Sequence, residues 1–285
     1  MNQKNKSFRG FIKSRIQGAV AAASRWGKFR NLFLEMYEDL LPMAERRAHG
    51  RTFRFFTPNI TARWRVDTYF EKEPETIEWI ETFSGNDVLY DIGANVGLYT
   101  IYAAARGKAE KVLAFEPESS NYALLNRNVA LNGLDDAAVC LNIALSSSRR
   151  LDYLYLAKMS AAESTHNFGA SVDYNKKEFD APFKQGAISF SLDEFIEQFA
   201  PPFPNHIKID VDGLEREIVL GAAATLRDAR MKSLLIEINE GLKEDLELVD
   251  LILGNGYTLR HKAHAPMFDG TQYASVYNYI FDHTA

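Results

Sequence analysis

The chain has 285 residues, of which 46% are hydrophobic and 12% aromatic, so it can bury one large core and carry an appendage. Its formal net charge of −5 argues against a general nucleic-acid binder, and we expect no nucleic-acid partner. The single cysteine, Cys140, excludes an intramolecular disulfide and agrees with a reducing cytosol. No apolar run reaches the roughly 18 residues that a transmembrane helix needs. These bounds predict a cytoplasmic protein with one main domain.

Residues 1–56 differ from the rest of the chain and predict a helical N-terminal extension. Eight Lys and Arg residues precede the first acid, Glu35, and apolar residues recur at close to helical spacing. The helical pattern continues over 31–48, and 51–56 reads as a short strand. Such a basic amphipathic helix fits two environments. It can pack on the main domain or on a partner subunit of a homodimer, or it can lie on an anionic membrane surface through residues 1–33.

Residues 57–285 alternate between strand and helix patterns, which predicts one α/β domain. The expected core strands lie at 88–92, 111–115, 138–145, 206–210 and 233–238, followed by a closing antiparallel pair at 257–261 and 276–281. A further pair at 151–157 and 187–190 alternates like strands at an exposed edge. Helices between strands imply a mainly parallel sheet that is covered on both faces. The predicted fold class is therefore α/β, with a doubly wound, Rossmann-like sheet of seven strands.

The stretch VLYDIGANVG at 88–97 reads as a buried strand that runs into a glycine turn. Gly93 and Gly97 permit backbone conformations that a Cβ would block. In the fingerprint G-x-G-x-x-G the second glycine lets the backbone meet a pyrophosphate, but here that position is Asn95. No Lys-Ser or Lys-Thr pair follows Gly97, so a phosphate loop is absent as well. The turn therefore predicts a nucleoside ligand without a pyrophosphate.

Two acids extend this interpretation. Glu116 ends the next strand, where a carboxylate can accept hydrogen bonds from both hydroxyls of a ribose. Asp91 precedes the turn, where it can meet a positively charged group of the ligand. S-adenosylmethionine has a ribose, an amino group and a sulfonium but no phosphate, so it fits this turn. The alternative is a nicotinamide-dependent oxidoreductase, which Asn95 and Leu98 disfavour.

The chain resembles the FkbM family of S-adenosylmethionine-dependent methyltransferases. Four segments carry the resemblance, namely EPET at 73–76, DIGANVG at 91–97, FEPE at 115–118 and IKIDVDGLE at 207–215. It implies a Rossmann-like methyltransferase sheet and transfer of a methyl group to a hydroxyl oxygen of a small molecule. The implied acceptor is a sugar unit of a glycan or another natural product. Asp212 departs from the pattern, because the family more often has Glu there.

Polar residues end five of the predicted strands, at the edge where open α/β sheets bind ligands. We expect nine residues to hold the cofactor, the last two of them by resemblance, against the adenine: Asp91, Gly93, Ala94, Asn95, Gly97, Glu116, Pro117, Asn142 and Ala144. For Asn142 the alternative is a turn-forming residue.

Asp210 ends the strand 206–210 and is the predicted catalytic residue, together with Glu237 on the neighbouring strand. Methyl transfer from a sulfonium is a direct displacement, so alignment contributes much of the rate. A hydroxyl acceptor also gains from proton removal, and desolvation would raise the pKa of Asp210 and make it a better base. We predict no metal site, but Asp210, Glu237 and Asn239 could supply oxygen ligands to a divalent ion. Lys208 could pair with Glu237.

The segment 159–185 is long, polar and poor in pattern, and insertions of this kind often form lids over substrates. His166 within it is interpreted as an exposed loop histidine rather than a base. A further alternative is a non-catalytic, membrane-associated scaffold with a methyltransferase fold, against which Asp91, Glu116 and Asp210 argue. If the extension binds lipid, the protein lies at the inner face of a membrane.

Overall fold

The computed structural model describes residues 3–23, 31–32, 35–36 and 41–284, and it divides into the units 1–42 and 43–285. In the first unit, α1 (Gln3–Ala23) is the helix that the basic, periodic pattern predicts. Phe11, Ile16 and Val20 of α1 are exposed. None of the helices in the described ranges is both long and apolar enough to cross a membrane. Contact of this helix with a membrane surface stays a prediction.

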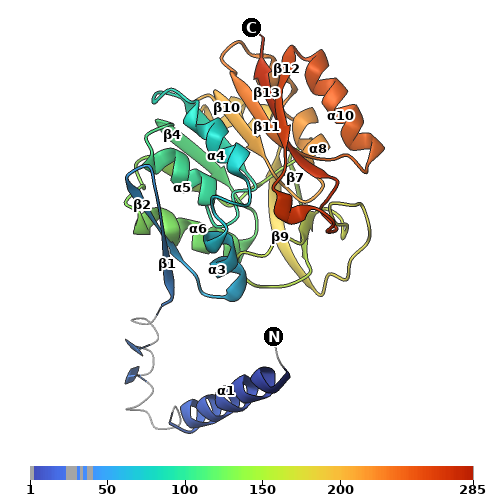
Figure 1. The fold of residues 1–285 in the computed structure, drawn as a ribbon. Coiled ribbons are helices and arrows are strands. Elements are labelled where there is room, and N and C mark those ends of the chain that lie inside the picture. Colours follow the sequence, from blue (N-terminus) through green and yellow to red (C-terminus); the bar gives the residue numbers. More distant parts are fainter. Residues whose placement is uncertain (1–2, 24–30, 33–34, 37–40, 285) are drawn as a thin grey trace. The chain divides into compact units, whose positions relative to one another are not determined.

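A seven-stranded sheet forms the centre of the second unit (Figure 1). Its strands are β3 (Val88–Ile92), β4 (Lys111–Phe115), β5 (Ala138–Leu141), β10 (His206–Ile209), β11 (Ser233–Asn239), β12 (Tyr257–Ala263) and β13 (Val276–His283). Their order is β12-β13-β11-β10-β3-β4-β5. β13 runs antiparallel to both neighbours, and the other adjacent pairs are parallel. The predicted mainly parallel, doubly wound α/β sheet with a closing antiparallel pair is thus confirmed.

Helices cover both faces of this sheet. Successive side chains of a strand point to opposite faces, so apolar residues of the core strands are buried on both sides. Leu89 packs on the face covered by α4 (Pro74–Glu81), α5 (Leu98–Ala105) and α6 (Ser119–Leu131). Val88 and Tyr90 pack on the face covered by α7 (Leu192–Phe199), α8 (Glu215–Leu220), α9 (Ala223–Arg227) and α10 (Lys243–Gly254). In Figure 1, α4 and α5 lie on one side of the strands, and α8 and α10 lie on the other.

A hairpin precedes the sheet, where the sequence predicted the end of a helix. β1 (Met43–Ala48) pairs with β2 (Arg51–Phe56) in antiparallel register. His49 and Gly50 between them have φ of 49° and 72°, as in the two-residue turns whose twist matches that of paired strands. The helical prediction is therefore wrong for 43–48, because strand pairing overrides the helix propensity of these residues. Part of the remaining range 31–42 lies outside the described residues.

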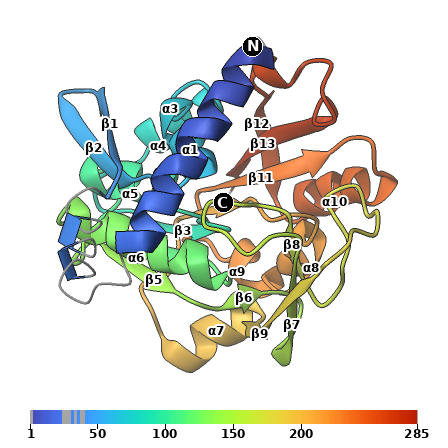
Figure 2. The same cartoon turned by 90° about the horizontal axis from the view of Figure 1, so that it is seen from below.

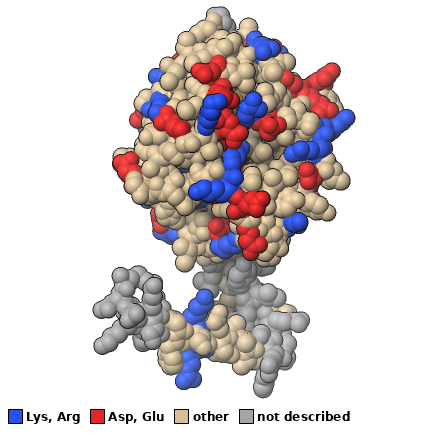
Figure 3. All heavy atoms as spheres, turned by 90° about the vertical axis from the view of Figure 1, so that its right-hand side faces the viewer, with Lys and Arg blue, Asp and Glu red and all other residues tan. Residues whose placement is uncertain are grey.

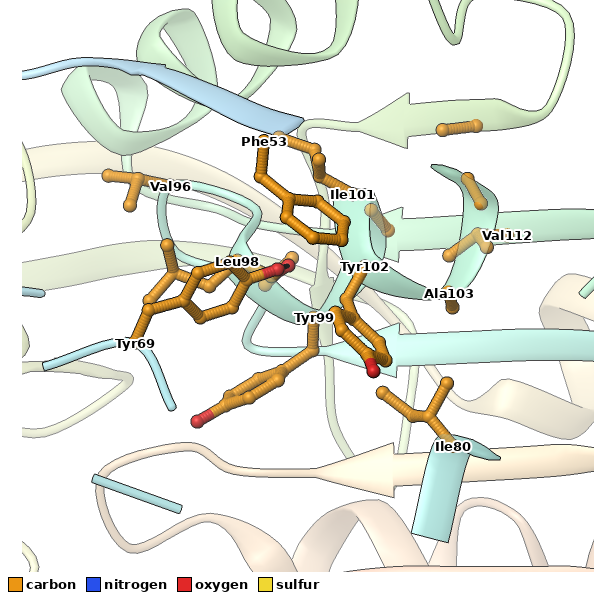
Figure 4. Packing of buried hydrophobic residues seen from close by; sticks show 14 of the residues in the cluster. Phe53, Tyr69, Ile80, Val96, Leu98, Tyr99, Ile101, Tyr102, Ala103 and Val112 are labelled. Carbon is orange, nitrogen blue, oxygen red and sulfur yellow. Dashed lines mark hydrogen bonds between the residues drawn. The ribbon is translucent and has the colours of Figure 1, made fainter. Parts of the chain in front are cut away.

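An aromatic cluster attaches this hairpin to the sheet (Figure 4). The ring of Phe53 stacks on Tyr102 of α5, with centroids 5.3 Å apart, and meets the ring of Tyr69 edge-on at 5.8 Å. The Tyr69 hydroxyl donates to the carbonyl oxygen of Leu98 at 2.6 Å. Burying an aromatic side chain of this size contributes about 2–3 kcal/mol. The compact unit therefore begins at Met43, whereas the predicted boundary placed the hairpin in the extension.

A second sheet has the order β6-β9-β7-β8, formed by β6 (Ala144–Leu145), β7 (Arg150–Leu156), β8 (His166–Phe168) and β9 (Phe183–Phe190). β7 and β9 pair antiparallel as predicted, but β7 lies between β9 and β8 rather than at an edge. Figure 2 shows β6 and β9 next to α7, where the rings of Phe190 and Phe195 have centroids 6.3 Å apart. The second sheet thus brings β8, from the segment without a predicted pattern, into the fold.

The surface of the second unit carries both signs of charge. On the face drawn in Figure 3, the Lys and Arg side chains of the described residues are interspersed with Asp and Glu. Proteins that are steered onto nucleic-acid phosphates instead present a field of one sign.

Candidate active site

The turn after β3 brings the chain into close contact with the end of β10. A Cβ on Gly93 would lie 1.9 Å from the carbonyl oxygen of Asp210, and the φ of Gly93 is +82°. Only glycine fits both conditions. The amides of Gly93 and Ala94 each donate to the carbonyl oxygen of Phe115 at 3.0 Å. The turn is therefore held between β4 and β10, at the carboxyl ends of the parallel strands.

A first pocket lies at this turn and encloses about 740 Å³ with its open mouth. The predicted cofactor residues that line it are Gly93, Asn95, Glu116, Pro117 and Ala144. Asp210, the predicted catalytic residue, lines it too, and the polar lining residues without a predicted role are Arg65, Lys72, Ser164, His166, Asn167 and Asp212. Four of these six come from helix α3 (Ile60–Asp67) and from the segment 159–185, whose positions depend on tertiary packing.

Glu116 is the central acid of the first pocket. Its Oε2 accepts a hydrogen bond from the amide of Asn95 at 2.8 Å, and its Oε1 accepts one from the amide of Glu118 at 2.8 Å. Burial raises the pKa of Glu116 to about 7, although these backbone donors lower it. His166 Nε2 lies 3.9 Å from Oε1, and burial lowers the pKa of His166 to about 4. Each Glu116 oxygen keeps a further lone pair for a ligand hydroxyl.

His166 corrects the interpretation of its segment. The imidazole is not an exposed loop side chain, because it belongs to β8, is only 14% exposed and lines the first pocket. With a pKa of about 4 it is neutral at pH 7, so it can donate from one ring nitrogen and accept at the other.

Two more side chains of this pocket keep an acceptor without a partner. The Oδ1 atoms of Asn95 and Asn167 are buried and accept no hydrogen bond from the described residues. Their Nδ2 atoms donate to the carbonyl oxygens of Glu163 at 2.9 Å and of Asp212 at 2.8 Å, which fixes both amides. An unsatisfied buried acceptor costs about 1–3 kcal/mol. The first pocket therefore fits a ligand that is rich in hydroxyl and amino donors.

Asp91 does not line either pocket, in contrast to its predicted contact with a charged ligand group. It is 1% exposed, and its Oδ2 accepts a hydrogen bond from Thr100 Oγ1 at 2.6 Å. Burial raises the pKa of Asp91, and the positive charge of Lys208 lowers it in part. Asp91 thus lies behind the turn, because its side chain belongs to the sheet face that α5 covers.

Asn142 is exposed and lines neither pocket. Its Nδ2 donates to the carbonyl oxygens of Glu116 at 2.9 Å and Pro117 at 3.0 Å, so it is the turn-forming residue of the two interpretations. Two other predicted cofactor residues do not line the pocket, namely Ala94 and Gly97. Ala94 packs in the core and Gly97 caps α5, so both shape the turn rather than contact a ligand.

A second pocket shares a wall with the first and encloses about 780 Å³ with its mouth. The residues that line both pockets are Arg65, Lys72, Ser164, Asp210 and Asp212. The remaining walls come from α3, the start of α4, the segment 159–185, β11, β13 and the connection between β12 and β13, which contains the short helix η1 (Pro266–Phe268). Glu237, a predicted catalytic residue, lines this second pocket, whereas Asn239 lines neither.

Asp210 stands between the two pockets, but it does not have the raised pKa that a buried base would need. Its Oδ2 lies 2.5 Å from the Nζ of Lys208, which is 1% exposed. Burial would raise the pKa of Asp210, but the charges of Lys208 and Lys72 outweigh burial and lower the pKa to about 2. The expected rise is therefore wrong. The expected pairing of Lys208 with Glu237 is wrong too, because Asp210 is the partner.

Asp212, which had no predicted role, is the carboxyl group whose pKa suits a base. Burial and the negative charge of Asp210 raise the pKa of Asp212 to about 8. It lines both pockets, so a proton leaving a group bound in one pocket can reach it from either side. The signal in the sequence was its position two residues after Asp210, in the stretch IDVDG at the end of a predicted strand.

The side chains at this edge do not fit the hypothesised metal ion. Among the described residues no group of three or more His, Cys, Asp or Glu side chains is placed to hold one. The Oδ1 of Asn239 accepts from the amide of Gly241 at 3.0 Å and from Ser275 Oγ at 2.8 Å. Burial and the charge of Asp210 raise the pKa of Glu237 well above its usual range. Asn239 is therefore occupied, and the raised pKa of Glu237 disfavours the ionised form that would bind a metal ion.

The chain is similar to several methyltransferases. A model of the methyltransferase FkbM domain matches residues 91–259. The hexuronic acid methyltransferase AglP of Haloferax volcanii is 25% identical over 193 residues, which cover 68% of this chain and 73% of that protein. The 31-O-demethyl-FK506 methyltransferase FkbM of Streptomyces tacrolimicus is 24% identical over 207 residues, which cover 65% and 78%. A crystal structure of the methyltransferase FkbM of Methylobacillus flagellatus KT is 16% identical, with a TM-score of 0.49 over 78% of this chain and 52% of that one.

Proposed function

Because the chain belongs to the FkbM methyltransferase family, we propose that it transfers the methyl group of S-adenosylmethionine to a hydroxyl oxygen. The observation that carries the proposal is the meeting of two pockets at Asp210 and Asp212, at the carboxyl ends of the parallel strands. One pocket has the groups that a nucleoside needs, and the other is open to an acceptor.

We assign S-adenosylmethionine to the first pocket on the basis of its hydrogen-bonding groups. Glu116 would accept hydrogen bonds from the ribose hydroxyls, and the Oδ1 atoms of Asn95 and Asn167 would accept from further donors. Ile143 and Ala144 would pack against the adenine, because both line this pocket. When bound, S-adenosylmethionine supplies an electrophilic methyl group on a sulfonium.

The second pocket would hold the acceptor, with Asp212 as its base. The acceptor oxygen would bond to the methyl carbon as the bond of that carbon to sulfur breaks and S-adenosylhomocysteine leaves, and the hydroxyl proton would pass to the Asp212 carboxylate. A pKa of about 8 leaves roughly a tenth of Asp212 ionised at pH 7, and the ionised form is a far stronger base than an ordinary aspartate. Asp210 stays ionised beside Lys208 and would orient the acceptor.

We propose a sugar unit of a glycan, or another small natural product, as the acceptor. Two relatives support this choice, since one is named a hexuronic acid methyltransferase and the other a 31-O-demethyl-FK506 methyltransferase. No metal is assigned a part in the reaction, because Asn239 and Glu237 do not fit one.

Calorimetric titration with S-adenosylmethionine and with S-adenosylhomocysteine tests the donor site. Wild type should bind both at micromolar concentration, and Glu116→Gln should weaken binding at least tenfold, which is about 1.4 kcal/mol. Glu110→Gln is the matched control, because Glu110 is exposed and precedes the same strand. Folded wild type that binds neither compound, but binds a nicotinamide dinucleotide, would refute the proposal.

A further inference from the structure

We infer that the second pocket binds a pyranose ring. The side chains of Glu237 and Asn278, together called the polar ledge, would form hydrogen bonds with its hydroxyls, and aromatic side chains would pack against its C–H groups. This inference rests on the proposed function, because it names the acceptor class of the same site. It follows from three features of the described residues: the pairing of β11 with β13, the unpartnered atoms of the ledge, and the aromatic lining.

Glu237 and Asn278 stand directly opposite each other in the antiparallel pair of β11 and β13. Side chains of directly opposed residues lie on the same face of a sheet, with Cβ atoms about 5 Å apart. Both residues line the second pocket. The two side chains therefore form one polar ledge, which presents adjacent hydrogen-bonding groups to whatever occupies the pocket.

The amide of Asn278 has a fixed orientation and a free acceptor. Its Nδ2 donates to Glu75 Oε1 at 2.7 Å, so the Oδ1 is the atom left over. That Oδ1 is buried and accepts no hydrogen bond from the described residues, and the whole residue is 6% exposed. A buried carbonyl oxygen in this state is stabilised when a ligand hydroxyl donates to it.

Glu237 complements this acceptor with a donor. Burial raises its pKa well above the usual range, and so do the negative charges of Asp210, Glu215 and Glu73, whereas Lys72 lowers it. This shift favours the neutral carboxylic acid, which has one O–H donor and remaining acceptor capacity. Together with the Asn278 Oδ1 it can bind two neighbouring hydroxyls, one as donor and one as acceptor.

Six of the other fifteen residues that line the second pocket carry an aromatic ring, namely Trp64, Tyr174, His264, Phe268, Tyr273 and Tyr277. Tyr174 stacks on Tyr273 with centroids 5.0 Å apart, and Phe268 meets Tyr273 edge-on at 5.9 Å. Tyr277 stacks on His264 at 4.3 Å. The faces of aromatic rings carry partial negative charge and attract polarised C–H groups.

A pyranose ring matches both parts of this lining, since it has C–H faces and a rim of hydroxyls. Tyr174 comes from the segment 159–185, and its main-chain carbonyl accepts a hydrogen bond from Asn239 Nδ2 at 3.2 Å. That segment therefore supplies one wall of the acceptor pocket.

Saturation-transfer NMR on the full chain, with S-adenosylhomocysteine and a sugar in the same sample, tests the inference. The sugars are the methyl pyranosides of glucose, galactose, mannose and glucuronic acid, and catechol is the flat diol compared with them. Wild type should saturate the S-adenosylhomocysteine protons and the ring protons of at least one pyranoside more strongly than catechol. Glu237→Leu and Tyr273→Ala should each weaken the pyranoside at least tenfold and leave S-adenosylhomocysteine unchanged.

Conservative and remote variants separate recognition from unfolding. Glu237→Gln should weaken the pyranoside at least fivefold less than Glu237→Leu, because an amide also has a donor and an acceptor. The matched controls are Glu247→Leu and Tyr153→Ala, whose side chains are exposed and line neither pocket, and both should bind like wild type.

Three results overturn the inference, and they separate its failure from that of the proposed function. Saturation of S-adenosylhomocysteine together with catechol, but with no pyranoside, removes the pyranose assignment and leaves the proposed function in place. Pyranoside binding that neither Glu237→Leu nor Tyr273→Ala weakens removes the assigned contacts of the second pocket and also leaves the proposed function in place. Absence of saturation of S-adenosylhomocysteine in folded wild type removes the proposed function and the inference with it.

Discussion

Replacing Glu215 by Gln should stabilise the fold at alkaline pH and leave its stability almost unchanged at acidic pH. Glu215 begins α8, is 5% exposed and accepts only long hydrogen bonds, from the amides of Val211 at 3.3 Å and Gly213 at 3.4 Å. Burial raises its pKa from 4.5 to about 8, and the negative charges of Asp245 and Asp212 contribute to the rise. The folded protein therefore holds a proton that the unfolded chain loses above pH 4.5.

The sign and the size of the effect follow from this difference. Between pH 4.5 and about 8 the folded state binds more protons than the unfolded state, so the free energy of unfolding falls as pH rises. A gap of about 3.5 pKa units corresponds to about 5 kcal/mol, which relaxation of the site reduces. Gln keeps the shape and carries no charge at any pH, so Glu215→Gln should gain about 2–4 kcal/mol over wild type at pH 8.5.

Urea unfolding followed by circular dichroism measures this difference at pH 5.0 and pH 8.5. Glu78→Gln is the control, since Glu78 is an exposed residue of α4, and it should differ equally little from wild type at both values. The reasoning would be refuted if Glu215→Gln and wild type differed by the same amount at both pH values, or if wild type were the more stable at pH 8.5.

Three further changes test the turn, the donor site and the base. Gly93→Ala should lower the melting temperature by about 10 °C or more, because its Cβ would lie 1.9 Å from the Asp210 carbonyl oxygen; a melting curve like that of wild type would contradict the geometry. S-adenosylmethionine should bind more weakly below pH 7, because hydroxyl donors favour the ionised form of Glu116, whose pKa is about 7, and the protein should release a proton on binding there. Calorimetric heats at pH 6.5 that do not depend on the ionisation enthalpy of the buffer would contradict this. Asp212→Asn should reduce the rate of methyl transfer by about 100-fold or more and abolish the rise of the rate up to pH 8. Its affinity for S-adenosylmethionine should stay within about threefold of wild type. An unchanged pH–rate profile would show that another group takes the proton.

Local patterns predicted the sheet well, because the periodicity of a strand or helix depends on near neighbours in the sequence. The strands β3, β4, β10 and β11 and the closing pair β12 and β13 all lie where alternation and turn residues placed them. In the hairpin, β2 lies at the predicted strand 51–56, whereas β1 was missed. The hairpin turn, His49-Gly50, lacks the usual Asn-Gly signal, and Met43–Ala48 consists largely of good helix formers.

The site was predicted only where it depends on the glycine turn and on strand ends. Glu116 and Asp210 were found because each ends a buried strand. Arg65 and His166 were not predicted as pocket residues, because α3 and the segment 159–185 reach the pocket through tertiary packing. The pKa values could not be predicted from the sequence either. Asp210 is ionised because Lys208 lies 2.5 Å away, and Asp212 has its high pKa because it is buried beside that ionised Asp210.

A crystal structure with S-adenosylhomocysteine bound would show whether the first pocket holds the methyl donor. We expect the ribose hydroxyls to contact Glu116, the adenine to lie against Ile143 and Ala144, and the sulfur to face the second pocket beside Asp212. Binding in the second pocket, or in the first pocket with the sulfur turned away from Asp212, would contradict this expectation.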